Sequence, residues 1–167
     1  FKQWQQIAVP DIDYPAVTIP KPQIIPYPFA RDQVVLGFLA PSISRTDKDF
    51  NALAIIDVIL SGGPNSNAAS RLFALREQSG LFYTISGSLT FDAGQQPGII
   101  FIKTIISKTK IEDAEKAILK TIDDLGKYGI TDEEFLQAKN VLFNATVELF
   151  ESNIQTARTL LFIKKNK

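Results

Sequence analysis

The apolar positions of this chain recur at helical spacing in several stretches. Residues 50–60 (FNALAIIDVIL) are apolar on nearly all sides, which predicts a heavily covered helix. Apolar side chains also recur at helical spacing over residues 111–125, and Gly126 and Gly129 are placed to end that helix. A last helix is predicted over residues 154–161. The chain is therefore rich in helix in its second half.

The segment after Thr131 carries a second helix signal. Thr131 and Glu134 have the spacing of a capping box, and the acids of residues 132–134 suit the positive end of a helix. The helix that follows has two apolar stripes, so we expect it to be covered on both sides. The stripes consist of Phe135, Ala138, Leu142 and Leu149, and of Leu136, Phe143, Val147 and Phe150.

Other apolar stretches have the pattern of strands. Residues 33–40 (QVVLGFLA) form a short apolar run that suits a buried strand. Residues 99–107 (IIFIKTIIS) are β-branched and follow a turn at residues 92–98, so we expect them to pair antiparallel with residues 81–91. These elements predict an α+β fold: a mainly antiparallel β-sheet with helices packed on one face.

Residues 70–89 (SRLFALREQSGLFYTISGSL) predict a helix, a glycine stop at Gly80 and a strand. In the strand, Leu81, Tyr83, Ile85 and Leu89 alternate with more polar positions and are expected to share one face. The tight reversal brings Arg76, in the last helical turn, near Tyr83. Both side chains can then point a hydrogen-bond donor at the same outside group.

The residues alone leave the role of this pair open. One interpretation packs Tyr83 in the core beside Leu81 and Ile85 and pairs Arg76 with an acid, because many strand tyrosines are simply packed. The other interpretation makes Arg76 and Tyr83 a binding pair at the surface. The pattern of the strand by itself favours the packed tyrosine.

Composition narrows the functions that this chain can have. Its 167 residues are long enough for one domain with a sizeable core, and its 18 basic and 18 acidic residues leave no net charge to attract nucleic acid or an anionic membrane. From the charge we predict no nucleic acid partner. We also predict no membrane insertion, because no apolar run approaches the roughly 20 residues of a membrane span. The sequence has no histidine and no cysteine. That excludes Ser-His-Asp and Cys-His catalysis and a zinc site of the usual kind within the chain.

Two polar features have a functional and a structural interpretation. The glycine loop at residues 60–70 precedes a helix, but it lacks the Gly-Lys-Ser/Thr end of a phosphate-binding loop. We expect instead a turn in which Asn65, Ser66 or Asn67 caps the next helix. Asp57 interrupts the apolar run of residues 50–60. We expect it at the rim of that helix, with a local hydrogen bond, rather than facing a partner.

Residues 1–29 contain six prolines and predict a stiff entry segment with one edge strand around residues 17–19. A proline-rich ligand for a binding module is the alternative function of this segment. Residues 30–167 then form a single α+β domain.

Several residue groups together resemble the insulinase/pitrilysin family of zinc metallopeptidases, which includes mitochondrial processing peptidase. The central match consists of Arg71-Leu72-Phe73, Leu75-Arg76-Glu77, Gly80-Leu81 and Tyr83. It is preceded by residues 59–63 (ILSGG) and followed by residues 131–135 (TDEEF) with Ala138-Lys139, in the family's order. The resemblance covers residues 30–160.

The resemblance implies a half-domain of a clamshell. In this family one domain holds zinc with a His-x-x-Glu-His motif, and a similar, catalytically silent C-terminal domain contributes an arginine and a tyrosine. A chain without histidine resembles the silent half. Arg76 and Tyr83 would then be substrate-binding residues that contact the peptide at the scissile carbonyl, and Tyr83 would also stabilise the developing oxyanion. The family's domain continues with further helix and a closing strand, so the resemblance implies a domain that extends beyond Lys167.

These inferences give one expected function and one alternative. We expect part of a zinc metalloendopeptidase that is inactive alone, has no catalytic residue, metal or cofactor of its own, and pairs with a homologous zinc-binding domain in the same or a separate chain. Peptide substrates and a homo-oligomer are the further partners considered, and the bacterial periplasm is the favoured compartment. The alternative is an inactive structural subunit of the same fold, of the kind found in processing and respiratory complexes.

Overall fold

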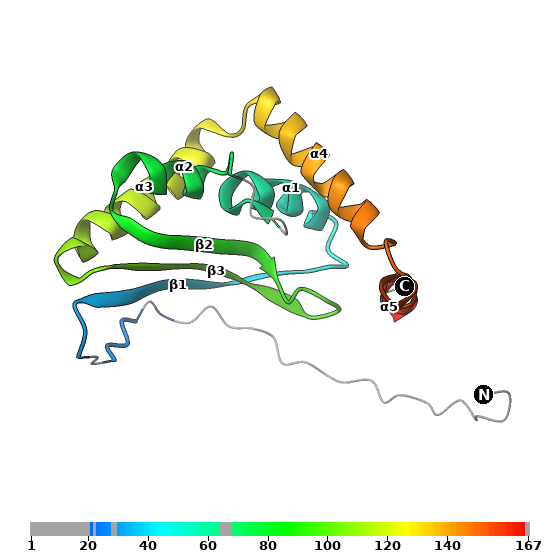
Figure 1. Cartoon of the computed structure of the whole chain (residues 1–167), viewed down its shortest axis with the longest axis horizontal. Helices are drawn as coiled ribbons and strands as arrows, with labels where there is room; N and C mark the ends of the chain where they lie inside the picture. The colour runs from blue at the N-terminus through cyan, green and yellow to red at the C-terminus, as the bar shows by residue number, and fades with distance from the viewer. Residues whose placement is uncertain (1–20, 22, 28–29, 64–67, 166–167) are drawn as a thin grey trace, which may run out of the picture.

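The structure, a computed structural model, describes residues 21, 23–27, 30–63 and 68–165. In this part of the chain, α1, α2 and α3 lie over one face of a three-stranded antiparallel sheet (Figure 1). The α+β class, the antiparallel sheet and the helices on one face are confirmed. The expected strand at residues 17–19 and most of the proline-rich segment lie outside the described residues.

The sheet contains β1 (Gln33–Ser44), β2 (Phe82–Phe91) and β3 (Pro97–Ser107), in the order β1-β3-β2. β3 is central and pairs antiparallel with both neighbours. Its β-branched residues suit this place, because a central strand is covered by neighbours on both edges. The predicted antiparallel pairing of residues 81–91 with residues 99–107 is confirmed.

The helices follow the predicted periodicities closely. They are α1 (Phe50–Ser61), α2 (Arg71–Ser79), the short 3-10 helix η2 (Lys108–Lys110), α3 (Ile111–Tyr128), α4 (Asp132–Glu148) and α5 (Asn153–Lys165). Gly129 caps α3, whereas Gly126 lies within it. The capping box of Thr131 and Glu134 at the start of α4 is confirmed.

The core lies between the sheet and the helices above it. Each of these elements except β1 contributes at least one buried apolar side chain: Leu60, Leu72, Phe82, Leu89, Ile102, Ile106, Ala114 and Ile118. A second cluster joins Val58 and Ile59 of α1 to Ala138 of α4. α1 therefore packs against the sheet with one side and against α4 with another, which is why its sequence is apolar nearly all round.

The expectation that α4 is covered on both sides is wrong. Its face with Ala138, Val141 and Leu142 packs on α1, but Phe143 on the other stripe is 70 % exposed. Within the described residues, no element lies over that second stripe. A repeat of apolar positions shows that a helix has an apolar face, but it does not show what covers the face.

The expected cap of α2 is also wrong. Ser70 occupies the N-cap position, and its hydroxyl accepts a hydrogen bond from the amide of Phe73 at 3.4 Å. Ser70 is buried, which ties the start of the helix to the core. Residues 64–67, which include the three residues named as candidate caps, lie outside the described part.

Among the described residues, no helix combines the length and the apolar character that crossing a bilayer requires.

Candidate substrate-binding corner between α2 and β2

The corner is a short helix followed by a sharp turn into an edge strand. Leu72 is buried in the core and fixes the first turn of α2, while the last turn of the helix is exposed. Gly80 then adopts the left-handed conformation with φ 63° and ψ 12° and ends the helix. Residues with a Cβ reach this conformation at a cost, so glycine suits the stop. The chain enters β2 two residues later at Phe82.

Arg76 stands in the last turn of α2. Its side chain is 40 % exposed, and its Nη1 lies 3.8 Å from Oε1 of Glu77. Its guanidinium carbon lies 5.8 Å from the centre of the Phe73 ring. Both contacts are long and are formed with neighbours on the same helix, so they leave the guanidinium available to a group from outside.

Tyr83 is 68 % exposed, so the packed interpretation of this tyrosine is wrong. The strand does not keep the expected alternation, because Phe82 pairs with Ile106 and Thr84 pairs with Ile105. β2 thus has one residue more than β3 at this point, which is the count of a β-bulge. The extra residue lets Phe82 point into the core and leaves Tyr83 outside.

A buried hydroxyl supports the bulge from the central strand. Thr104 of β3 is fully buried, and its Oγ1 donates a hydrogen bond to the carbonyl of Thr84 at 2.6 Å. Bulges disturb the regular ladder of backbone bonds, so a side-chain donor beside one gives a displaced carbonyl a partner. This role of Thr104 could not be predicted from the sequence, where its only signal is a hydroxyl beside Lys103 in a mostly apolar strand.

The corner therefore presents two different donors on either side of Gly80. The guanidinium of Arg76 offers several N–H groups with a permanent charge, and the phenol of Tyr83 offers one neutral O–H. Such donors suit the carbonyl oxygens of an extended peptide. That the two groups converge on one ligand atom stays a prediction.

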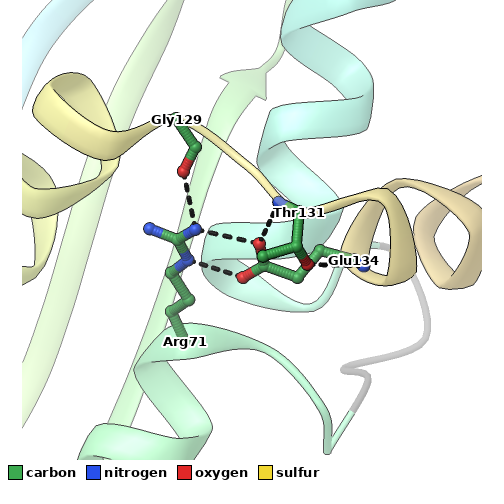
Figure 2. Close-up of polar contacts among 4 residues, drawn as sticks. All are labelled: Arg71, Gly129, Thr131 and Glu134. Carbon is green, nitrogen blue, oxygen red and sulfur yellow. Dashed lines mark hydrogen bonds and ion pairs between the residues drawn. The ribbon is translucent and has the colours of Figure 1, made fainter.

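Arg71, the first residue of α2, joins that helix to the segment between α3 and α4 (Figure 2). Its Nε donates to Oε1 of Glu134 at 2.7 Å, and its Nη2 donates to Oε2 of Glu134 at 2.9 Å and to the carbonyl of Gly129 at 2.8 Å. Oε2 of Glu134 also accepts from the amide of Thr131 at 2.8 Å. We call these four residues the Arg71 clamp.

The clamp shifts the pKa values of both charged groups. Hydrogen bonds from Arg71, which is the largest cause, and from the Thr131 amide together lower the pKa of Glu134 to about 2. The hydrogen bond to Glu134 in turn raises the pKa of Arg71. The sequence predicted the bond between Thr131 and Glu134, but not that Arg71 would complete it from 63 positions away.

Asp57 is 6 % exposed, so its expected place at the rim of α1 is wrong. Its Oδ1 accepts the expected local bond from Ser61 at 2.6 Å. Its Oδ2 accepts from the hydroxyls of Ser88 at 2.8 Å and Thr90 at 3.0 Å, both on β2. A buried carboxylate needs such partners. Asp57 thus anchors α1 to the end of β2 that lies farther from Tyr83.

The described residues do not fit a zinc site. They contain no group of three or more histidine, cysteine, aspartate or glutamate side chains that could hold a metal ion. An open, mostly apolar hollow of about 390 Å³ lies between β1, β3 and α1 and is lined by residues such as Pro41, Leu53 and Ile100. Pro41 pairs with Ile99, at the opposite end of β3 from Tyr83, so this hollow is separate from the corner.

Comparison with solved structures supports the fold. The chain is similar to the peptidase M16 inactive domain from Pseudomonas fluorescens, with 26 % identity, a TM-score of 0.67, and coverage of 79 % of this chain and 30 % of the other. It is also similar to a conserved protein from Enterococcus faecalis V583, with 20 % identity, a TM-score of 0.64, and coverage of 80 % of this chain and 29 % of the other. A protease from Helicobacter pylori is similar as well, with 21 % identity, a TM-score of 0.61, and coverage of 75 % of this chain and 29 % of the other. The chain thus spans about 30 % of these proteins.

None of the curated proteins compared with the chain matches it. A family model does match, with the description "Peptidase M16 inactive domain" and over residues 1–142. The match confirms the resemblance to the inactive domain of the insulinase-type peptidases. Because it spans most of the 167 residues, the chain belongs to the family of the peptidase M16 inactive domain.

Proposed function

We propose that this chain is the substrate-contacting, non-catalytic domain of a zinc-dependent peptidase, and that Arg76 and Tyr83 hold the peptide at the bond to be cut. Zinc is held by a homologous domain with a His-x-x-Glu-His motif, in the same or a separate chain. The 167 residues alone are then inactive, and the bacterial periplasm stays a prediction.

The observation that carries the proposal is the exposure of Tyr83. A tyrosine in a strand next to a core usually packs its ring, yet the bulge at residues 82–84 turns this ring outward. Arg76 is exposed on the other side of Gly80. An inactive domain has no catalytic use of its own for such a pair, so contact with the peptide that the active domain cuts would give the pair a function.

The chemistry of peptide hydrolysis suits these two donors. Attack of water on a peptide carbonyl builds negative charge on the carbonyl oxygen, and a donor already placed there stabilises the transition state more than the ground state. Tyr83 supplies a neutral O–H for this oxygen. Arg76 binds a neighbouring carbonyl of the peptide backbone and keeps the chain extended.

The test is the substitution Tyr83→Phe in the full-length protein that contains this chain. The ring keeps its size and loses only the hydroxyl, so folding is expected to stay unchanged. The kcat/KM for peptide cleavage is expected to fall about 10²- to 10³-fold, which is the usual loss for one oxyanion donor. Arg76→Ala is expected to lower kcat/KM as well, through weaker peptide binding.

The matched controls are Tyr128→Phe and Arg158→Ala. Tyr128 is 71 % exposed at the end of α3, and Arg158 is exposed on α5, so both have the same chemistry away from the corner. The controls should leave kcat/KM within about twofold of the wild type. Full activity of both Tyr83→Phe and Arg76→Ala would contradict the proposal.

The second candidate is an inactive structural subunit of the same fold. The observation that favours it is the apolar surface of α4 and α5, with exposed side chains such as Phe143, Ile154 and Leu161. Surfaces of this kind often mark protein interfaces. A full-length protein without the His-x-x-Glu-His motif in any associated domain, and with no peptidase activity, would support this candidate.

A further inference from the structure

We propose that Arg71 and Glu134 are positioning residues: by fixing the start of α2 they set the place of the Arg76 guanidinium at the peptide. This inference rests on the proposed function. It assigns a role in substrate contact to a pair of residues that lies outside the corner itself.

Arg76 depends on its helix for its position. Its own side-chain contacts are a 3.8 Å ion pair with Glu77 and a ring contact with Phe73, both within α2. Neither contact fixes the guanidinium relative to the sheet. The direction of α2 therefore decides where Arg76 lies relative to Tyr83 on β2.

α2 is only nine residues long, and its apolar anchors to the core are Leu72 in the first turn and the partly buried Leu75 in the second. Ser70 caps it and Leu72 is buried, whereas residues 77–79 at its other end are exposed. The Arg71 clamp adds three hydrogen bonds from this same first turn to Gly129 and Glu134 (Figure 2). Removal of the clamp leaves the helix attached mostly through apolar contacts, which resist tilting less than directed bonds do.

The geometry of a helix carries the effect from Arg71 to Arg76. Five residues span about 7.5 Å along the helix axis and about 140° around it. Arg76 thus points away from the clamp and lies about two-thirds of the helix length from it. A small tilt at the first turn displaces the guanidinium at the last turn, and a misplacement of about 1 Å is enough to cost on the order of 10²-fold in rate.

The pairing in the clamp depends on its shape as well as its charge. Two N–H groups of Arg71 meet the two oxygens of one carboxylate, an arrangement that fixes the angle between the groups. The amide of Thr131 holds the same carboxylate from the other side. Lysine at position 71 would keep the charge but could not form the two parallel bonds.

The experiment is a double-mutant cycle on kcat/KM in the full-length protein, with Arg71→Ala, Arg76→Ala and both together. If Arg71 acts through Arg76, Arg71→Ala lowers kcat/KM about tenfold in the wild type and less than about twofold once Arg76 is already alanine. It should also change the same parameter, kcat or KM, that Arg76→Ala changes. The melting temperature should fall equally in both backgrounds, because the two residues do not contact each other.

Equal losses of kcat/KM in both backgrounds would show that the clamp serves only the fold, and they would overturn the inference while Arg76 keeps its role. No loss from Arg76→Ala alone would instead remove Arg76 from the proposed function, and the inference with it, while full activity of Tyr83→Phe as well would overturn the proposed function itself. Arg71→Lys provides the same test if Arg71→Ala fails to fold. Lys116→Ala, which removes an exposed ion pair with Glu112 on α3, is the control and should change kcat/KM less than about twofold.

Discussion

Glu134 shows how one carboxylate can hold three segments together. It accepts hydrogen bonds from Arg71 at the start of α2 and from the amide of Thr131, while its own amide donates to the hydroxyl of Thr131 at 3.1 Å. The side chain is about three-quarters removed from solvent, so these bonds are worth more than those of an exposed pair. Loss of its charge should therefore loosen both the α4 cap and the attachment of α2.

This prediction can be tested by pH. The pKa of Glu134 is about 2 in the folded chain against an ordinary value of 4.5, so its stabilisation is complete above about pH 4.5 and fades as the pH falls towards 2. At pH 7, Glu134→Gln should lower the free energy of unfolding by about 1–3 kcal/mol. The difference between the two proteins should shrink in urea titrations at pH 4 and pH 3.

Glu133→Gln is the control for this titration. Glu133 is the exposed neighbour of Glu134 and accepts only a 3.2 Å bond from Gln137. Its substitution should change the free energy of unfolding by less than about 0.5 kcal/mol at every pH. A loss from Glu134→Gln that stays constant from pH 7 to pH 3 would contradict the role of the charge.

The sequence allowed the contacts of some residues to be predicted and not those of others. The bond between Thr131 and Glu134 was predictable, because a capping box is a local pattern with a fixed spacing. The outward turn of Tyr83 was not, because a bulge is defined by the partner strand and leaves the sequence of β2 unchanged. The place of Asp57 was also predicted wrongly, because its partners Ser88 and Thr90 are more than 30 positions away and no local pattern points to them.

Among the elements, α4 has two apolar faces, of which one is buried and the other is exposed. Ala138 is buried between α4 and α1, where it contacts the cluster of Val58 and Ile59. Phe143 lies on the stripe that the described residues leave open. The sequence predicted the inward places of Ala138 and Leu142, but it missed Val141 on the same face and assigned the exposed stripe to the interior as well, since periodicity does not show which elements are adjacent.

This difference predicts that two substitutions in α4 of the 167-residue chain change its free energy of unfolding by different amounts. Ala138→Leu inserts three heavy atoms into a closed contact and should cost about 1–3 kcal/mol of unfolding free energy. Phe143→Lys changes a side chain that is already exposed and should change it by less than about 0.5 kcal/mol. Thermal and urea unfolding of both variants would measure this. A large loss from Phe143→Lys would mean that the stripe is covered in the chain.

At the scale of the whole molecule, the residues that the structure describes place helices on one face of the sheet and none on the other. The covering helices are α1, α2 and α3 (Figure 1), and Ile102 and Ile106 of β3 belong to the core that these helices share with the sheet. On β1, Val35 and Leu39 alternate with residues that pack on the core, and both are well exposed. The sequence predicted helices on one face of the sheet, because strands and amphipathic helices must share a core, but its expectation of a buried strand over residues 33–40 is wrong, since β1 is an edge strand. It gave no information on what meets the outer face.

The open face predicts a specific response to a double substitution. The double substitution is Val35→Thr with Leu39→Thr. Threonine is β-branched and suits a strand, so the change removes two exposed apolar side chains without disfavouring β1. In the 167-residue chain this variant should bind less of a hydrophobic dye such as ANS, while its free energy of unfolding changes by less than about 0.5 kcal/mol per position. Unchanged dye binding would contradict this prediction. It would mean that the dye binds other surfaces, such as α4 and α5, and that this face of the sheet is shielded from the dye.

The strand order also dictates when the sheet can assemble during synthesis. Gln33 at the start of β1 pairs with Ser107 at the end of β3, so β1 leaves the ribosome about 70 residues before its partner is complete. At about 5–20 residues per second, β1 waits roughly 4–15 s without a neighbouring strand. The hairpin of β2 and β3 can close as soon as both have emerged, and β1 then joins it from the far side. The apolar strand β1 is thus synthesised well before the strand that pairs with it.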